Sequence, residues 1–316
     1  MSNLTALIIG SGVAVSNYES GASLRVQYLK RLLEAQGYQV EIKDNKQAKI
    51  GLDRSYDLIL ITSYSCASLA KRARQQTKIL WFDPYDSWIN ARFSLLKRGK
   101  FLQLVALLRD IYFTSIFPQR EITSFISVRD AKFHPWFLRK DNLFILPIHF
   151  TEQLVTQSTE ARLIFVGDGN FRPNQYALPF LNKLGKKLGL PIWVIGQNFP
   201  YKSKYPYLTF LGYVDSSDLF KSMDIHIVPI RYGSGIKTKV ALPLSLGLRV
   251  VSSKSAAVGI RRVETLKVAN SIDTFAATIQ EQMNQNWKFT DTFLNVYESD
   301  DFEKLKCFLK MLGEKK

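Results

Sequence analysis

Short apolar runs recur along the whole chain, and most are separated by stretches with helical periodicity. The segment 24–36 has apolar residues at helical spacing and ends at Gly37, a residue favoured just after a helix. Buried parallel strands appear as apolar runs of this length, so the alternation predicts βαβ units and a mainly parallel sheet. In the first half the runs lie at 6–9, around Val40, and at 58–61, 79–82, 122–126 and 143–146.

The second half repeats the pattern, with runs that begin at Leu163, Ile192, Leu208, Ile225 and Arg249. A polar stretch rich in Ser, Thr and Gln, 151–161, separates the halves. A chain of 316 residues fits two domains of ordinary size. We therefore expect an α/β fold of two Rossmann-like domains, 1–150 and 151–297, with a cleft between them. The last segment, 291–312, has helical spacing, and a helix at about 298–316 is a candidate to pack on the first domain.

Glycines and basic residues follow the expected strands of the second half. Parallel sheets bind ligands beyond the carboxyl ends of their strands. Glycine lets the backbone approach a phosphate, the start of a helix offers free N–H groups, and Arg and Lys balance negative charge. The pattern predicts a site for an anionic ligand, although an ordinary strand-to-helix turn with solvated basic side chains is the alternative. The residues in this expected crevice are Arg231, Gly233, Gly235, Lys237 and Lys239.

The chain is strongly basic, with 43 Lys and Arg against 27 Asp and Glu and a formal charge of +16. This charge favours a negative partner: nucleic acid, anionic lipid or a charged small substrate. No nucleic-acid-binding motif is recognised, so nucleic acid ranks third among the expected functions. The segment 92–109 mixes apolar and basic residues, which suits an anionic membrane surface, and a core helix with a solvated basic edge is the alternative.

Cysteine and histidine usage points away from disulfide or metal chemistry. Cys66 and Cys307 lie far apart and outside any C-x-x-C pair. His134, His149 and His226 have neither metal-ligand spacing nor a triad partner. No leader or membrane-spanning run is recognised, so we expect a cytoplasmic chain, with a peripheral position on the inner face of the membrane as a further possibility.

Several motifs follow one another in a fixed order. They are residues 23–26 after Gly21, 126–131, 165–167 with 172–174, 210–214, Arg231-x-Gly-x-Gly-x-Lys-x-Lys, and the run ending at Gly247 with 249–252. In this order they resemble the GT-B-fold glycosyltransferases of the family-4 type, which transfer a sugar from a nucleotide-sugar donor. The similarity covers almost the whole chain and is strongest over 163–260.

The resemblance implies that the second domain binds the donor and the first presents the acceptor. A UDP- or GDP-sugar is the expected donor, without a metal or further cofactor, and a glycan, lipid-linked or protein acceptor is expected. Retention of configuration and a role in polysaccharide biosynthesis are also implied. A second copy of the chain or a partner glycosyltransferase is a further candidate partner. The expected donor-site residues are Gly10, Gly12, Gly21, Gly167, Arg172, Asn174, Gly196, Gly212, Tyr213, Val214, Arg231, Gly233, Ser234, Gly235, Lys237 and Lys239.

Two further observations qualify the resemblance. Acids that the family carries near the donor would fall on Leu242, Ser234 and Val258, which favours a divergent member, with a catalytically silent glycan- or partner-binding subunit as the alternative. The Gly10-Ser11-Gly12 sequence is not a dinucleotide fingerprint, because its third glycine would fall on Val15.

Two aspartates follow the expected strand 79–82 and are the candidate catalytic acids. Asp83 and Asp86 lie where an acid could orient or deprotonate an acceptor hydroxyl. The alternative role for each is a helix N-cap or a turn aspartate.

Overall fold

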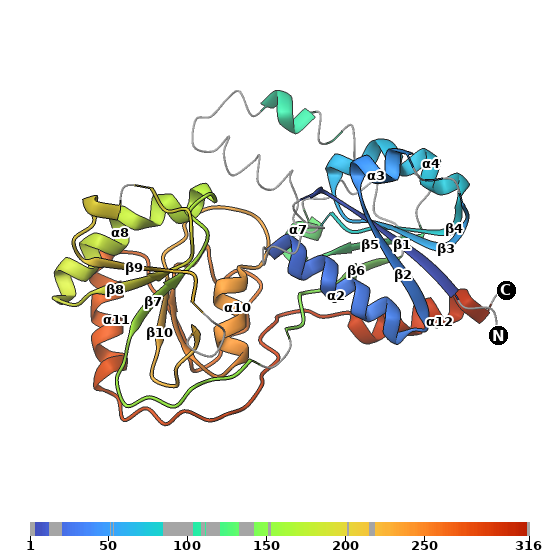
Figure 1. Ribbon diagram of the computed structural model, residues 1–316. Coiled ribbons are helices and arrows are strands. Elements are labelled where there is room, and N and C mark those ends of the chain that lie inside the picture. The colour runs from blue at the N-terminus through green and yellow to red at the C-terminus, as the bar shows by residue number, and fades with distance from the viewer. Residues whose placement is uncertain are drawn as a thin grey trace. The chain divides into compact units, whose positions relative to one another are not determined.

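The computed structural model describes residues 4–12, 21–50, 52, 54–84, 104–108, 111, 121–132, 142–150, 153–200, 202–214 and 219–314. The chain divides into two compact units. Unit 1 comprises Met1–His149 and Ser299–Lys316, and unit 2 comprises Phe150–Glu298. Within the described residues each unit holds a six-stranded, wholly parallel sheet with helices on both faces (Figure 1). The predicted α/β fold of two Rossmann-like domains is confirmed.

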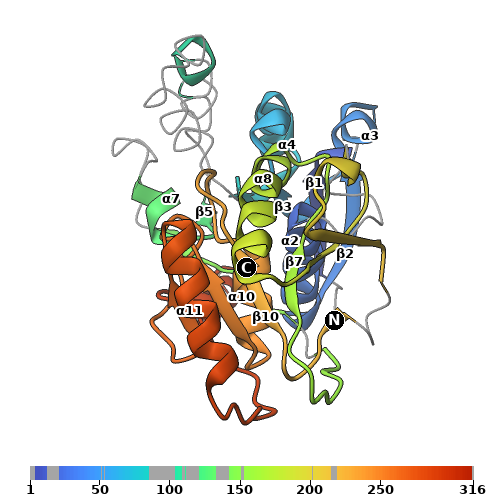
Figure 2. The same ribbon diagram turned by 90° about the vertical axis from the view of Figure 1, so that its left-hand side faces the viewer.

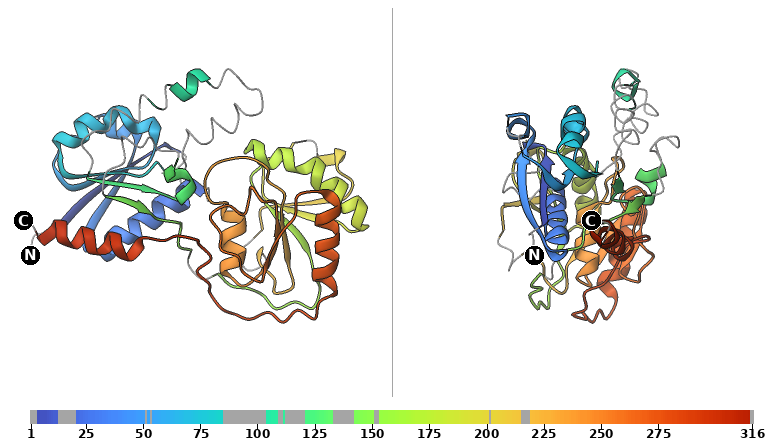
Figure 3. Two further views of the ribbon diagram at one scale, coloured as in Figure 1. Left: turned by 180° about the vertical axis from the view of Figure 1, so that it is seen from behind. Right: turned by 90° about the vertical axis from the view of Figure 1, so that its right-hand side faces the viewer.

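The sheet of unit 1 has the strand order β2-β1-β3-β4-β5-β6. Helices α2 and α12 lie on one face and α3 and α4 on the other (Figures 1 and 3). The elements are β1 (Leu4–Gly10), α2 (Gly21–Ala35), β2 (Tyr38–Asp44), α3 (Asn45–Ile50), β3 (Tyr56–Ile61), α4 (Ala70–Gln75), β4 (Thr77–Phe82), β5 (Ile122–Phe125), α7 (Val128–Lys132), β6 (Leu143–Ile145) and α12 (Phe302–Glu314).

Burial explains why the apolar runs of unit 1 become its strands. The run in β1 is completely buried, and Leu7 and Ile9 pack in one cluster with residues of β3, β4 and the following helices. Each such side chain contributes about 1.5–3 kcal/mol when fully buried. Gly37 follows α2 with φ +84°, and its N–H donates to Glu34 O at 3.0 Å, so this glycine closes the helix as the sequence predicts.

The sheet of unit 2 has the strand order β12-β11-β10-β7-β8-β9. Helices α8 and α11 lie together on one face, and α10 lies on the other (Figures 1 and 2). The elements are β7 (Leu163–Val166), α8 (Arg172–Leu188), β8 (Ile192–Ile195), β9 (Leu208–Gly212), β10 (Ile225–Val228), α10 (Thr238–Ser245), β11 (Arg249–Ser252), β12 (Leu266–Val268) and α11 (Ile272–Asn284).

The C-terminal helix is shorter than its sequence pattern, because α12 begins only at Phe302. Residues before it hydrogen-bond to unit 2, as when Leu294 N–H donates to Ser245 O at 2.8 Å. Asp301 then binds β6 through two contacts: its N–H donates to Ile145 O at 2.7 Å, and its Oδ2 accepts from Ile145 N–H at 2.8 Å. The Phe308 ring of α12 lies 5.6 Å from the Phe144 ring. The helix thereby becomes part of unit 1.

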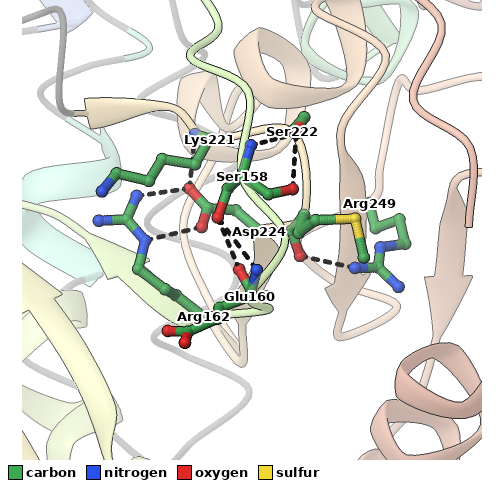
Figure 4. A network of polar contacts seen from close by, with 8 residues as sticks. Ser158, Glu160, Arg162, Lys221, Ser222, Asp224 and Arg249 are labelled. Carbon is green, nitrogen blue, oxygen red and sulfur yellow. Dashed lines mark hydrogen bonds and ion pairs between the residues drawn. The ribbon is translucent and has the colours of Figure 1, made fainter.

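A polar network lies at the amino ends of the strands in unit 2 (Figure 4). Arg162, just before β7, pairs with Asp224, just before β10, through Nε–Oδ1 and Nη2–Oδ2 distances of 2.8 and 2.7 Å. The Asp224 side chain is fully buried, and it also accepts from Lys221 N–H at 2.8 Å. Arg249 donates from Nη2 to Met223 O at 2.6 Å, and burial lowers its pKa to about 10. The network holds the two central strands in register.

Across the described part of the chain, no helix is both long and apolar enough to cross a bilayer.

Candidate functional site

In the sheet of unit 2, the direction in which the chain adds new strands reverses between the adjacent strands β7 and β10. The chain runs outward from β7 through β8 and β9, then returns to β10 on the other side of β7 and continues to β11 and β12. The loops that follow β7 and β10 therefore lead in opposite directions from the carboxyl edge of the sheet. Such a topological switch point is the usual ligand crevice of an open α/β sheet. Gly167 follows β7 here, and the glycine-rich loop 229–237 follows β10.

Three of the predicted glycines meet at this edge. Gly167 N–H donates to Ile195 O at 2.9 Å, and Gly196 N–H donates to Gly212 O at 2.7 Å. Gly196 has φ +130°, and a Cβ there would lie 1.8 Å from Gly167 O. No side chain fits that space, so glycine is required for the ends of β7, β8 and β9 to approach one another.

The loop after β7 is held against the loop after β8. Gly169 N–H donates to Gln197 O at 2.8 Å, and a Cβ on Gly169 would lie 2.2 Å from the Asn198 carbonyl. Asp168 Oδ1 accepts from Asn170 N–H at 2.9 Å and from Asn198 Nδ2 at 3.1 Å. Asp168, Gly169 and Asn198 were missed at the sequence level, although a Gly-x-Gly directly after a strand is a signal that could have found them.

Helix α8 begins beside this loop. Arg172 is exposed at its first position, and Pro173 follows in the first turn, where its missing N–H costs no helical hydrogen bond. Asn174 is only 2% exposed, and its Nδ2 donates to Asp168 O at 2.8 Å. Its Oδ1 accepts from Lys239 Nζ of α10 at 2.5 Å. This hydrogen bond joins α8 and α10, which lie on opposite faces of the sheet, at the carboxyl edge.

The loop before α10 winds around Lys237. The Lys237 ammonium donates to the backbone oxygens of Ser234 and Gly235, the latter at 3.0 Å. Gly233 and Gly235 have φ values of +118° and +72°, which allow this close turn. A Cβ on Gly233 would lie 3.3 Å from Lys237 Nζ. Four predicted residues, Gly233, Ser234, Gly235 and Lys237, are therefore brought together.

Lys239 is a half-buried lysine with an unusual environment. Its Nζ lies 4.8 Å from the centre of the Phe165 ring, and a Cβ on Gly167 would lie 2.8 Å from it. Burial and the like charge of Lys237 lower the pKa of Lys239 to about 7, and Asp168 acts in the opposite direction. In the structure its hydrogen-bond acceptor is the neutral amide of Asn174.

Other predicted donor residues lie apart from this cluster. Arg231 is exposed, donates from Nη2 to Asn270 O at 3.3 Å and lies over the Phe180 ring. Tyr213 is 66% exposed after β9, and Val214 follows it. The remaining three belong to unit 1: Gly10 ends β1, Gly12 follows it, and Gly21 begins α2.

Asp83, one of the two candidate catalytic acids, is completely buried in unit 1. Arg25 of α2 donates to it from Nε at 3.3 Å and from Nη2 at 2.5 Å, and Ser124 Oγ donates at 2.5 Å. Arg25 also donates to the backbone oxygens of Leu146 and Pro147. In this arrangement the Asp83 carboxylate holds Arg25 at the carboxyl edge of the sheet. Asp86 lies outside the described residues.

Two of the three histidines, His149 and His226, lie among the described residues. His226 is buried in β10, where burial lowers its pKa to about 4, and its Nε2 has no hydrogen-bond partner among the described residues. His149 Nε2 lies 2.6 Å from Asp300 Oδ2, and His134 lies outside the described residues. Within the described ranges no group of three or more His, Cys, Asp or Glu could hold a metal ion.

The positions that lack the family's acids have other roles. Leu242 of α10 packs against a buried cluster of Phe220, Leu246 and Leu248. Ser234 supplies its carbonyl oxygen to Lys237, and Val258 is half-buried after β11. The ribose of a bound donor would therefore meet no carboxylate from these three positions.

Comparison with known proteins gives a family-model match over part of the chain and a fold for the whole of it. Residues 136–285, which include nearly all of unit 2, match the family model described as Glycosyl transferases group 1. No curated protein matches the sequence.

Solved structures resemble the whole chain at low sequence identity. The apo form of the lipopolysaccharide outer core galactosyltransferase WaaB is 11% identical over 97% of this chain and 100% of that chain, with a TM-score of 0.59. A UDP-forming α,α-trehalose-phosphate synthase from Burkholderia xenovorans, in complex with glucose-6-phosphate, is 10% identical over 89% and 92%, with a TM-score of 0.56. The UDP-GlcNAc 2-epimerase of Methanocaldococcus jannaschii, in complex with UDP-GlcNAc and UDP, is 8% identical over 97% and 99%, with a TM-score of 0.53.

The two parallel sheets and these likenesses define the chain as a GT-B-fold protein. Residues 136–285, within this fold, are similar to the glycosyl transferases of group 1.

Proposed function

We propose that unit 2 binds a nucleotide sugar, with the diphosphate between the start of α10 and the loop after β7. The observation that carries the proposal is the pair of ammonium groups, Lys237 and Lys239, beside the glycines at the switch point of the sheet. A UDP-sugar is the preferred donor and a GDP-sugar the second, because two of the similar structures are named for UDP or its sugar.

The proposed chemistry is stabilisation of the leaving nucleotide. Negative charge builds on the diphosphate as its bond to the sugar breaks, and the two ammonium groups and the N–H groups at the start of α10 lie where they could offset it. One such donor contributes about 2.7–4 kcal/mol in enzymes studied by mutation. These groups would take the part that a divalent cation plays elsewhere, so we propose transfer without a metal. The family resemblance supports retention of configuration.

Unit 1 is proposed to present a glycan or a lipid-linked acceptor. Three apolar side chains of the segment 104–108 support a lipid: Leu104, Val105 and Leu108 are 51%, 73% and 60% exposed. Basic residues precede them in the sequence, and such a mixture suits an anionic bilayer surface. Asp83 would act indirectly, by fixing Arg25, and Asp86 is the proposed acid for the acceptor hydroxyl.

Thermal unfolding with a panel of UDP-, GDP-, CMP- and TDP-linked sugars tests donor binding. A donor at about 100 times its dissociation constant adds about 2.7 kcal/mol. At about 2–4 °C per kcal/mol this gives a rise in Tm of roughly 5–10 °C. Lys237→Ala and Lys239→Ala should each remove most of the shift and lower turnover at least about tenfold. Lys186→Ala, on the exposed last turn of α8, is the matched control and should behave as the wild type.

A silent binding subunit is the second candidate, and the apolar packing of Leu242 is the observation that favours it. Binding of an acceptor glycan together with no response to any nucleotide sugar would select this second function. A shift with one nucleotide class and turnover with an acceptor would reject it.

A further inference from the structure

Asn174, a predicted donor-site residue, is enclosed by the protein. The residue is 2% exposed, and both ends of its amide are already bound inside the protein. Nδ2 donates to Asp168 O at 2.8 Å, and Oδ1 accepts from Lys239 Nζ at 2.5 Å. A side chain held in this way can act on a ligand through the lysine that it binds.

The Asp168 carbonyl fixes the direction of this amide. A carbonyl oxygen accepts but does not donate, so it must face the NH2 end of Asn174, and the oxygen end is turned toward Lys239. Gly167 completes the arrangement, because a Cβ there would lie 2.5 Å from Asn174 Nδ2 and 2.8 Å from Lys239 Nζ. The lysine therefore has one fixed, neutral acceptor beside the end of β7.

We propose that Asn174 is a positioning residue for donor binding: its neutral amide holds the Lys239 ammonium at the switch point without balancing its charge, so that the diphosphate supplies the counter-charge. This inference rests on the proposed function and deepens it. An aspartate in the same place would hold the lysine equally well but would neutralise it before the donor arrived.

The charges around Lys239 give the proposal a consequence for pH. Among the described residues, Lys237 from the loop before α10 and Asp168 from the loop after β7 are the charged groups that act on it, and burial is the larger cause of its lowered pKa of about 7. A bound diphosphate favours the charged lysine and raises that pKa. Donor binding should therefore take up a proton above about pH 7, and affinity should fall as the pH rises further.

The test measures the dissociation constant of UDP-glucose and of GDP-mannose between pH 6 and 9, for the wild type and for Asn174→Asp. Nucleotide sugars are better probes than free nucleotides, whose terminal phosphate titrates near pH 6, at about the second pKa of a phosphate ester. For the wild type, the dissociation constant should rise by up to about tenfold per pH unit above about pH 7. For Asn174→Asp, binding should be at least about tenfold weaker at pH 7 with a flat profile, because the new carboxylate keeps the lysine charged and paired.

Two further variants make the result specific. Asn182→Asp places the same new charge on the same helix, at a residue whose Oδ1 accepts from Tyr207 N–H at 3.0 Å, and should keep the wild-type profile. Lys239→Arg keeps a charge at every pH tested, so it should bind donor with no fall above pH 7 even if Asn174→Asp folds poorly.

The outcomes separate the inference from the function beneath it. If neither nucleotide sugar binds the wild type, the proposed function fails and this inference with it. If the wild type binds and Asn174→Asp loses thermal stability but keeps the wild-type affinity and pH profile, Asn174 is only structural. In that case the inference is overturned while donor binding stands.

Discussion

Replacing Gly196 by alanine should destabilise unit 2 and distort the proposed donor site together. Two costs add at this position. Its φ of +130° is a conformation that L-residues rarely adopt, at about 1–3 kcal/mol. The added Cβ would also lie 1.8 Å from Gly167 O, so backbone must move, and overpacking of this kind costs about 1–3 kcal/mol. We expect a loss of about 2–6 kcal/mol, or roughly 4–24 °C in Tm at about 2–4 °C per kcal/mol.

Gly189→Ala is the matched control. Gly189 ends α8 with φ +67°, and a Cβ there would meet nothing within 4 Å. Only the left-handed backbone is then penalised, by about 1–2 kcal/mol. Differential scanning calorimetry of both variants, with and without UDP-glucose, separates the cost of the left-handed backbone from the cost of the contact with Gly167 O. Equal losses in the two variants would refute the argument that Gly196 is required by its contact with Gly167.

Two predictions concern parts of the molecule away from the proposed donor site. Asp224→Asn should lower the free energy of unfolding by about 3–5 kcal/mol in urea, because it removes the carboxylate that pairs with Arg162 in a largely buried position. Asp273→Asn breaks the exposed pair with Lys187 and should cost less than about 1 kcal/mol, and a similar loss in both variants would contradict the role given to burial. Replacing Leu104, Val105 and Leu108 by serine should abolish sedimentation with vesicles of anionic phospholipid, and unchanged sedimentation would exclude this surface as the docking site.

The strands could be predicted because most of them are buried on both faces. Every residue of β10 and β11 is buried, and the Ile and Val residues in them mark both strands in the sequence. β12 was not predicted, because it is three residues long, lies at the edge of its sheet and is only partly buried. The start of α12 was misplaced for a different reason. The apolar residues at helical spacing begin at Phe302 itself, and backbone hydrogen bonds hold residues up to Glu298 in unit 2.

The candidate site was predictable only where it follows from strand ends. Gly167, Gly196 and Gly212 each come directly after or at the end of a strand, and parallel strands bring their ends to one edge. The contact between Asn174 and Lys239 joins residues 65 positions apart from helices on opposite faces, and no local pattern encodes it. Asp83 shows the converse. Its position after β4 makes it a candidate acid, and only the fold reveals that it pairs with Arg25, 58 residues earlier in the chain.

The return of α12 to unit 1 sets an order for folding during synthesis. Unit 2 is continuous in sequence and can fold as soon as residue 298 has left the ribosome, whereas unit 1 lacks its last helix until later. From residue 149 to residue 299 translation takes roughly 8–30 s at about 5–20 residues per second. Throughout that interval Phe144 lacks its partner Phe308 of α12, and Ile145 N–H lacks its acceptor Asp301. The nascent chain therefore presents an apolar patch on its earlier half, where a chaperone bound to the emerging polypeptide would have time to act.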